Sequence, residues 1–275
     1  MVQPNRLSPG RAGCYVTFVA FDPTVPSTAR MYDYYLGGKD NFEVDRDAAE
    51  QVLATAPEIR QVAVENRAFL GRVVRYLAGE GIRQFIDVGS GLPTRGNVAD
   101  EAQAAAPGSR VVCVDHDPIV CVHARALLGN ATEVAVVQAP MERPAEILAN
   151  PELTRLIDFS EPIAALFFSV LHFADDAAAI VAAFRGVMPA GSYLALSHGV
   201  PSQVPGGSAQ GSEVKQVYGR SSSPGGAFRT EAEILDLFRG FDLVEPGLVP
   251  VTDWRNQAGN AAGRAWLLGG VGRLG

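Results

Sequence analysis

An acid, a pair of glycines and a second acid are spaced as a nucleoside site requires. Asp87 lies in the apolar run "QFIDV", and Gly89, Ser90 and Gly91 follow that run directly. Glycines at such a strand-to-loop turn let the backbone approach a ligand closely. Asp115 ends the next run, "RVVCVD", 26 residues after Gly89. A carboxylate at that strand end can accept hydrogen bonds from two ribose hydroxyls.

Two phosphate-binding readings of the glycine loop are disfavoured. A P-loop needs a lysine and then Ser or Thr after its second glycine, and this loop has none. A dinucleotide loop has a third glycine three residues after the second, where this chain has Thr94 after Pro93. The loop therefore favours a nucleoside without phosphates. His116 follows Asp115 and is placed to border an adenine.

The elements around these residues predict an α/β fold. From residue 82 onward, short apolar runs alternate with helical patterns, as in a mostly parallel sheet covered on both faces. The runs "FDLVEPGLVPV" and "AWLLGGVGRL" have no helix between them, which predicts an antiparallel ending. Parallel strands place their carboxyl ends at one edge of the sheet, so the two acids and the glycine loop should meet there.

The chain divides into an arm and one predicted domain. Residues 1–26 carry four prolines and little periodicity, which indicates a loosely ordered arm. Residues 27–275 form a single domain, in which 27–80 are a helical cap and 82–275 a Rossmann-like core. Residues 200–228, rich in Gly, Ser and Pro, are predicted to be an insertion over the site.

Composition excludes several classes of protein. The chain has 275 residues, 47% hydrophobic and 19% charged, with a formal charge of −7, which argues against a nucleic-acid partner. It has neither a cleavable secretion signal nor the roughly 20 consecutive apolar residues of a membrane span. Its three cysteines favour a reducing compartment over a disulfide scaffold. We therefore predict a cytoplasmic protein with no membrane partner; a homodimer is compatible with the sequence.

Long stretches of the chain match one known family. They include "PSTARMYDYYLGGKDNF", "ENRAFLGRVVRYL", "QFIDVGSGLPTRGNV", "VVCVDHDPIV" and "LIDFSEPIAALFFSVLHF". The chain resembles class I S-adenosylmethionine-dependent methyltransferases, and more closely an actinobacterial group of S-adenosyl methyltransferases of mostly unknown substrate. The resemblance implies a Rossmann-like fold with a seven-stranded, mostly parallel sheet, an antiparallel last strand and a helical N-terminal cap.

The resemblance also implies S-adenosyl-L-methionine as the cofactor. Asp87 and the glycine loop would wrap its methionine part, Asp115 would take the ribose, and His116 would border the adenine. Three further polar residues are placed at the cofactor's amino and carboxylate ends. The predicted cofactor-binding residues are Asp87, Gly89, Ser90, Gly91, Asp115, His116, Met141, Arg67, Asp40 and Asn41.

Two positions depart from the family pattern. Similar proteins read "VQAD" after the third strand, and that acid would meet the adenine amino group. This chain reads "VVQAPMERP", with Pro140 in its place. Similar proteins also tend to carry a histidine where this chain has Ala99.

Three residues are candidates for catalysis. His172 lies in "SVLHFADD", which is similar to "LHDWSD" of small-molecule O-methyltransferases, where the histidine is the general base. The alternative is a structural histidine bonded to the backbone. His198, at the end of the fifth strand, is a second candidate base. Tyr32 belongs to an aromatic cluster that either forms a lid over the acceptor or packs the N-terminal helices.

No metal site is predicted. Cys113, His116, Cys121 and His123 lie close together in the sequence. They lack a second matched pair, and Cys113 is in the middle of a strand, where core packing is expected.

The predicted function is methyl transfer to an oxygen or nitrogen of a small, partly apolar metabolite in specialised metabolism. Pro140 keeps a second reading open, in which the enzyme uses the cofactor without methyl transfer for a cyclisation or rearrangement. A non-catalytic cofactor-sensing protein is a third reading, and an NAD-dependent oxidoreductase is a distant fourth.

Overall fold

A computed structural model describes residues 22–275 apart from 95, 129–130, 201–206, 224–228 and 257–265, so most of the predicted arm lies outside it. Within these residues the centre is an eight-stranded sheet in the order β3-β2-β1-β4-β5-β8-β6, with β7 also paired to β8. The strands are β1 (Gln84–Val88), β2 (Arg110–Asp115), β3 (Val134–Gln138), β4 (Ala164–Phe168), β5 (Tyr193–Gly199), β6 (Phe241–Leu243), β7 (Val249–Pro250) and β8 (Leu267–Leu274).

Strand directions confirm the predicted fold class. The strands β1 to β5 pair in parallel, and β8 runs antiparallel to β5, β6 and β7. The described sheet has one strand more than the seven predicted. The segment "FDLVEPGLVPV" forms two short strands, because Gly247 turns the chain between them at φ +90°.

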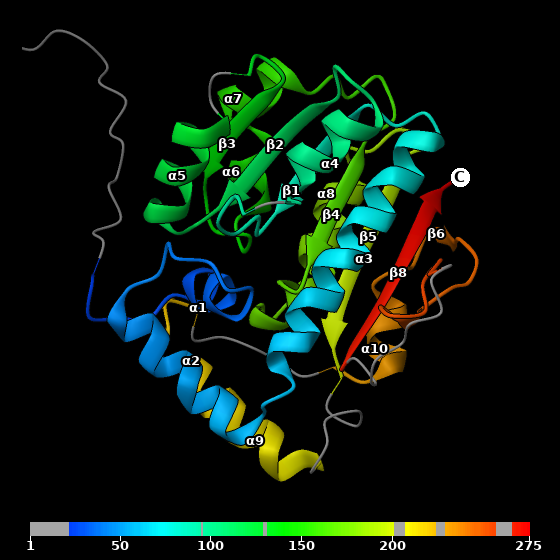
Figure 1. The fold of residues 1–275 in the computed structure, drawn as a ribbon. Helices are drawn as coiled ribbons and strands as arrows, with labels where there is room; N and C mark the ends of the chain where they lie inside the picture. The colour runs from blue at the N-terminus through cyan, green and yellow to red at the C-terminus, as the bar shows by residue number, and fades with distance from the viewer. Residues whose placement is uncertain (1–21, 95, 129–130, 201–206, 224–228, 257–265) are drawn as a thin grey trace, which may run out of the picture.

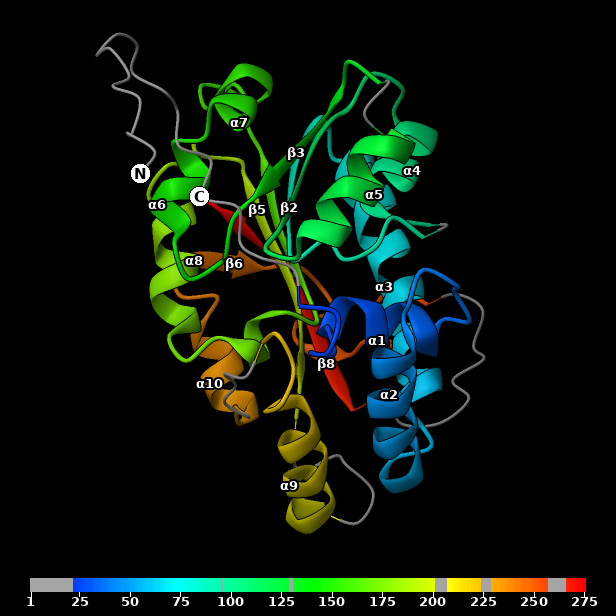
Figure 2. The same cartoon turned by 90° about the vertical axis from the view of Figure 1, so that its left-hand side faces the viewer.

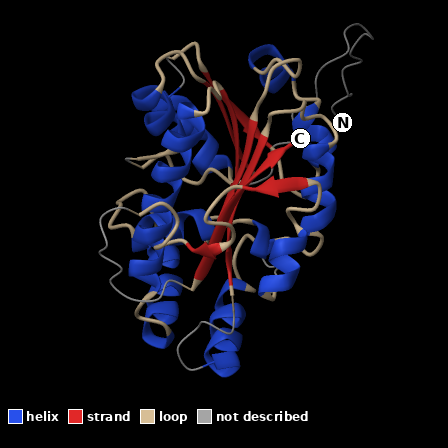
Figure 3. Cartoon of the chain, turned by 90° about the vertical axis from the view of Figure 1, so that its right-hand side faces the viewer, coloured by secondary structure: helices blue, strands red, loops and turns tan. Residues whose placement is uncertain are grey.

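Helices cover both faces of the sheet. Figure 2 shows α3, α4 and α5 on one face and α6, α7, α8 and α10 on the other, and Figure 3 shows from the opposite side that helices flank the sheet on both faces. The helices are α1 (Thr28–Tyr35), α2 (Glu43–Thr55), α3 (Ile59–Gly79), α4 (Val98–Ala105), α5 (Pro118–Leu128), α6 (Pro144–Leu148), α7 (Pro151–Leu156), the 3₁₀ turn η1 (Leu171–Phe173), α8 (Ala177–Arg185), α9 (Gly207–Tyr218) and α10 (Glu231–Asp236).

The two-sided cover explains why the central strands are apolar throughout. Successive side chains of a strand point to opposite faces, so a sheet buried on both faces has no polar alternation. In β4, Phe168 packs edge-on against Phe69 of α3 at 5.7 Å between ring centroids. Its neighbour Phe167 packs against Phe184 of α8 at 5.3 Å. One strand thus contributes to both apolar cores.

Three helices lie beyond the carboxyl ends of the parallel strands, and we call α1, α2 and α9 the cap (Figure 1). The helix α9 packs against α2, and the N–H of Ser222 donates to the carbonyl of Pro26 at 2.8 Å. The insertion after β5 is therefore tied to the start of α1. The helix α3, predicted as part of the cap, also packs on β4, β5 and β8 because it carries a continuous apolar face.

None of the helices among the described residues combines the length and apolar character needed to cross a membrane.

Candidate functional site

A cavity of about 790 Å³ opens where the parallel strands end beneath the cap. Its volume falls in the range of small-molecule sites, roughly 300–1,000 Å³. The loops after β1, β2, β3 and β4 line it from the sheet, and α1, α3 and α9 line it from above. Of the thirteen residues predicted for the site, ten line this cavity. Those ten are Tyr32, Arg67, Asp87, Gly89, Ser90, Gly91, Asp115, His116, Met141 and His172.

The glycine loop after β1 has the conformation that its sequence predicts. Gly89 and Gly91 have φ of +74° and +64°, in the left-handed region that glycine adopts without strain. The N–H groups of Gly89 and Ser90 donate to the carbonyl of Val114 at 2.8 and 3.1 Å. A Cβ on Gly89 would lie 2.3 Å from a methyl of Val170. The loop is thus fixed against β2 and packed on Val170, the second residue after β4.

Asp115 lies at the cavity wall with both carboxylate oxygens already oriented. Its Oδ2 accepts the N–H of Gly91 at 2.9 Å, and its Oδ1 accepts the N–H of Asp117 at 3.0 Å. Burial raises the pKa of Asp115, which His116 and these two N–H donors oppose. The Nδ1 of His116 is 3.6 Å from Oδ1. A fixed carboxylate of this kind can accept two further hydroxyl donors.

Asp87 and Arg67 place opposite charges beside the glycine loop without bonding to each other. The carboxylate of Asp87 is 5% exposed and makes no hydrogen bond or ion pair with the described residues. Burial raises its pKa to about 7, although the Arg67 guanidinium acts in the opposite direction. The Nε of Arg67 is buried without a partner among those residues, while its NH2 donates to Thr94 Oγ1 at 3.2 Å. The pair matches the ammonium and carboxylate of an amino acid.

The loop after β3 forms a further part of the cavity wall. Ala139, Pro140 and Met141 line the cavity there, together with His116, whose Nε2 is buried without a partner among the described residues. Pro140 offers no side-chain acceptor, and its carbonyl already accepts the N–H of Arg143 at 3.1 Å. Glu142 on the same loop also lines the cavity.

The opposite end of the cavity is aromatic. Its ring-bearing residues come from α1, η1, α9 and the position before β8: Tyr32, Tyr35, His172, Phe173, Tyr218 and Trp266. The rings of Phe173 and Tyr218 lie 5.6 Å apart, and the hydroxyls of Tyr35 and Tyr218 are 3.3 Å apart. Tyr34, the third tyrosine of the cluster, instead donates to Glu50. Sequence reasoning expected this division, because three such neighbours cannot share one helix face.

Tyr32 lines the cavity wall, and its hydroxyl is already hydrogen-bonded within the protein. It donates to the carbonyl of Ala63 at 3.0 Å and accepts from Asn66 Nδ2 at 3.1 Å. Burial raises the pKa of Tyr32, so the phenol stays protonated. The structure therefore favours a positioning role over the predicted catalytic one.

His172 lies on η1, directly beyond β4, and lines the cavity. Its ring is 4.4 Å from that of Phe173 and 5.5 Å from that of His198, between centroids. Burial, together with His198 and the Arg229 charge, lowers the pKa of His172 to about 3. The imidazole is therefore neutral at physiological pH. It can accept a hydrogen bond but is a weak base.

His198 does not reach the cavity, which corrects its prediction as a catalytic residue. Its Nδ1 is 2.8 Å from the carbonyl of Gly199, which can only accept, so Nδ1 carries the proton. Its Nε2 then accepts from Arg229 at 3.1 Å. The cause is the pleat of β5: Ser197 faces α3, where its Oγ donates to Asn66 Oδ1 at 2.6 Å, and His198 faces the other side.

Asp40 and Asn41 also lie outside the cavity, so we remove both from the cofactor site. The amide of Asn41 donates to Asp33 Oδ2 at 2.8 Å, and its Oδ1 accepts from Arg46 at 3.2 Å. The carboxylate of Asp40 faces His123, 3.8 Å away. The loop between α1 and α2 folds back on α1, and its polar groups satisfy the cap itself.

Asn66 is a cavity residue that sequence reasoning missed. It is 3% exposed and joins Tyr32 of the cap to Ser197 of β5. Ser197 Oγ in turn accepts the N–H of Ser169, a cavity residue with φ +51°. The sequence does contain a signal for Asn66, because it is a polar residue within the apolar stripe of α3. A buried amide without hydrogen-bond partners is costly, so such a residue is expected to bind a specific partner.

The described residues contain no group of three or more His, Cys, Asp or Glu side chains placed to hold a metal ion. Cys113 and Cys121 are free thiols buried beside β2.

Fold and site together define the class. A parallel sheet with an antiparallel end, a positive-φ glycine loop and a fixed acid at the end of β2 fit an S-adenosylmethionine-dependent methyltransferase of class I. The chain belongs to the S-adenosyl methyltransferase family, whose model matches residues 18–275. Its cofactor is S-adenosyl-L-methionine. The unpaired Asp87 carboxylate and Arg67 Nε fit the methionine end of that molecule.

Solved structures agree with this assignment. A protein of Thermobifida fusca YX, described only provisionally as a methyltransferase, is 39% identical, covers 91% of this chain and 96% of its own, and has a TM-score of 0.84. A DUF574 family protein of Streptomyces avermitilis is 38% identical, covers 91% and 98%, and has a TM-score of 0.85. An O-methyltransferase family protein of Burkholderia thailandensis, 15% identical over 79% and 60% with a TM-score of 0.50, shares the fold. No curated protein matches the chain.

Proposed function

We propose that the protein methylates an oxygen or nitrogen of a small, uncharged and largely apolar metabolite. The observation that supports this is the form of the cavity, which runs without interruption from the Asp87–Asp115 end to the aromatic end. The first end suits a nucleoside with an amino-acid tail. The second end is left for an acceptor.

The cofactor would be held by groups on α3, at the ends of β1 and β2, and on the loop after β3. Asp87 and Arg67 would bind the ammonium and carboxylate of the methionine part, and Asp115 the ribose hydroxyls. The adenine would lie between His116 and Met141. Pro140 stands where similar proteins have an acid on this loop. Glu142, two residues later, also lines the cavity and would be the acid nearest in sequence to that position.

The charges around the cavity support a neutral acceptor. Among the described lining residues Arg67 is the only Arg or Lys, and it lies beside Asp87. Arg67 also lies 5.8 Å from the centroid of the Tyr32 ring, so an anionic acceptor would have to share this one guanidinium with the cofactor's carboxylate to offset its desolvation. Flat apolar groups suit this lining, where they can pack against rings such as Phe173 and Tyr218.

The chain's own contribution to the reaction is alignment and exclusion of water. The bound cofactor supplies a methyl group on a cationic sulfur, which a neutral oxygen or nitrogen can attack. His172 would accept a hydrogen bond from the attacking O–H or N–H and so fix its lone pair towards the methyl. The proton becomes strongly acidic once the methyl has bonded, so even a weakly basic imidazole can take it.

A panel of acceptors tests the proposal. Purified protein with S-adenosylmethionine is offered phenols, aromatic amines, aliphatic alcohols and aromatic carboxylic acids, and S-adenosylhomocysteine is counted by mass spectrometry. We expect turnover with neutral aromatic hydroxyl or amino compounds and none above background with the acids. Turnover confined to the acids, or to peptides, would contradict the proposal.

His172→Ala is expected to lower kcat/KM for the best acceptor by about a hundredfold. Because the pKa of His172 is about 3, its protonation leaves the rate at saturating cofactor unchanged between pH 5 and 8. Initial rates across that range check both points. Tyr34→Phe is a matched control outside the cavity and should retain wild-type kinetics. A rate that titrates near pH 6.5, and loses that titration in His172→Ala, would show an ordinary general base instead.

A further inference from the structure

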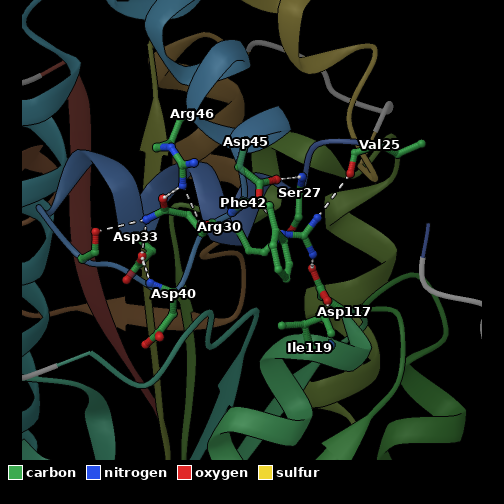
Figure 4. A network of polar contacts seen from close by, with 12 residues as sticks. Val25, Ser27, Arg30, Asp33, Asp40, Phe42, Asp45, Arg46, Asp117 and Ile119 are labelled. Carbon is green, nitrogen blue, oxygen red and sulfur yellow. Dashed lines mark hydrogen bonds and ion pairs between the residues drawn. The ribbon is translucent and has the colours of Figure 1, made fainter. Parts of the chain in front are cut away.

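One buried arginine joins the cap to the sheet (Figure 4). Arg30 of α1 is 2% exposed. Its Nε donates to Asp45 Oδ2 at 2.7 Å and its NH1 to Asp117 Oδ2 at 2.9 Å, while NH2 donates to the carbonyl of Val25 at 3.2 Å. A single guanidinium thus bridges α1, α2 and the turn after β2.

On the cap side, Asp45 organises the starts of two helices. Its Oδ1 accepts the N–H of Ser27 at 2.8 Å, directly before α1. Its Oδ2 accepts the N–H of Phe42 at 2.8 Å, directly before α2, together with Arg30. Figure 4 shows these bonds converging on one carboxylate. The position of Arg30 is therefore set by the folded cap as a whole.

On the sheet side, the contacts continue to the cofactor loops. Asp117 Oδ1 accepts the N–H of Ile119 at 2.8 Å, which fixes the start of α5. The N–H of Asp117 donates to Asp115 Oδ1, and Asp115 Oδ2 accepts the N–H of Gly91. Three consecutive contacts therefore lead from the Arg30 guanidinium through Asp117 and Asp115 to the glycine loop.

We infer that Arg30 is a positioning residue of the cofactor site, which orients Asp115 through Asp117 and couples seating of the cap to cofactor binding. The inference rests on the proposed role of Asp115. The physical reason is that the guanidinium is buried: if the turn at 115–117 moved, Arg30 would lose one of its two carboxylates inside the protein, at high cost. Coupling of this kind is reciprocal, so a ligand that fixes Asp115 also favours the seated cap.

The test uses two variants that keep the size of the side chains. Arg30→Lys keeps the charge but cannot bridge both carboxylates, and Asp117→Asn keeps the acceptor for Ile119 but removes the ion pair. Binding of S-adenosylhomocysteine is measured by calorimetry, and hydrogen exchange of residues 28–55 is measured with and without it. We expect Kd to rise about tenfold in each variant, and the ligand-induced protection of 28–55 to be reduced at saturation.

Arg46→Lys is the matched control. Arg46 is also a cap arginine with two hydrogen bonds, but both go to Asn41 within the cap. It should keep the wild-type Kd and the wild-type protection. Asp115→Ala is the reference for the site itself and should weaken binding about a hundredfold.

The outcomes separate the two proposals. If Asp115→Ala weakens binding while Arg30→Lys and Asp117→Asn lower only the Tm, Arg30 is a structural residue and the inference is overturned. If Asp115→Ala itself leaves Kd unchanged, the proposed cofactor site is wrong. If Arg30→Lys does not fold, Asp117→Asn decides the question, because it disturbs only the sheet side of the bridge.

Discussion

Replacement of Asp87 by Asn is expected to stabilise the cofactor-free protein at pH 8 and to weaken cofactor binding. The carboxylate is buried, unpaired among the described residues, and has a pKa raised to about 7. Above that pH the folded protein holds a buried charge without a hydrogen-bond partner. Asn has nearly the same shape and no charge. Asp87 thus lowers the stability of the folded protein, and its role in cofactor binding explains why an acid is present there.

The sign of the stability effect follows from proton linkage. Asp87 titrates near pH 7 when folded and near 3.9 when unfolded, so between these values the folded state holds the extra proton. Protonation of Asp87 adds to the free energy of unfolding. This contribution is complete below the pKa of the unfolded state and is lost as the pH rises through the pKa of the folded state. The loss amounts to at most ~4 kcal/mol. The difference in Tm between Asp87→Asn and wild type should therefore grow from pH 4 to 7 and stay constant above.

Cofactor binding favours the ionised form of Asp87, whereas folding favours the protonated form. The cationic methionine end of the cofactor needs the ionised carboxylate, so wild-type affinity should be about tenfold weaker at pH 6 than at pH 8. Arg67 and Asp115 also face this group and shift its pKa in opposite directions. In Asp87→Asn, affinity at pH 8 should fall tenfold to a hundredfold, by rough expectation, and this pH dependence should disappear. Calorimetry at both pH values checks it, and an equal pH dependence in the variant would assign the titration to another group.

The part of the site that sequence predicts is the part that local backbone geometry determines. Gly89, Gly91 and Asp115 were identified because a turn after a parallel strand needs positive φ and places its neighbours at one edge of the sheet. The alternation of apolar runs and helices indicated the sheet class for the same reason. Each of these inferences uses only a few consecutive residues.

The residues that the sequence misplaces or misses are those whose position depends on which way a side chain or loop faces, or on a partner far away in the chain. His198 was placed correctly at a strand end, but the pattern did not show which face of β5 it would occupy. Asp40 and Asn41 follow a helix, and their loop could fold towards the cavity or back on α1. Arg30 finds Asp117, 87 residues away, and no local pattern encodes such a pair.

The acceptor end of the cavity was less predictable than the cofactor end for the same reason. Its wall combines Tyr32 of α1, Phe173 of η1, Tyr218 of α9 and Trp266 before β8. Packing of the insertion after β5 on α2 brings Tyr218 to this wall, whereas the N–H of Val200, bonded to the carbonyl of Trp266 at 2.9 Å, holds Trp266 there. The cofactor half is built from consecutive strand ends, whereas the acceptor half is a product of tertiary packing.

Gly89→Ala is expected to be the most damaging single methyl addition in the glycine loop. At φ +74° an alanine is strained by about 1–2 kcal/mol. Its methyl would also lie 2.3 Å from one Val170 methyl and 2.8 Å from the Val170 Cβ, and overpacking of this kind costs a further ~1–3 kcal/mol. Urea unfolding should show the sum as a lower free energy of unfolding, and cofactor binding should be lost because the loop must move off Val170.

Gly91→Ala separates the two contributions. Gly91 has φ +64°, and a methyl group added there would have no described atom within 4 Å, so this variant carries the backbone strain without the clash. The loss of chain entropy in the unfolded state is common to both variants and cancels in their difference. Gly89→Ala should therefore be less stable than Gly91→Ala by the overpacking cost, and Val170→Ala should recover part of that difference in Gly89→Ala alone. Equal stabilities of the two variants would show that the Val170 side chain moves away at no cost. The destabilisation would then come from the positive φ of the glycines alone.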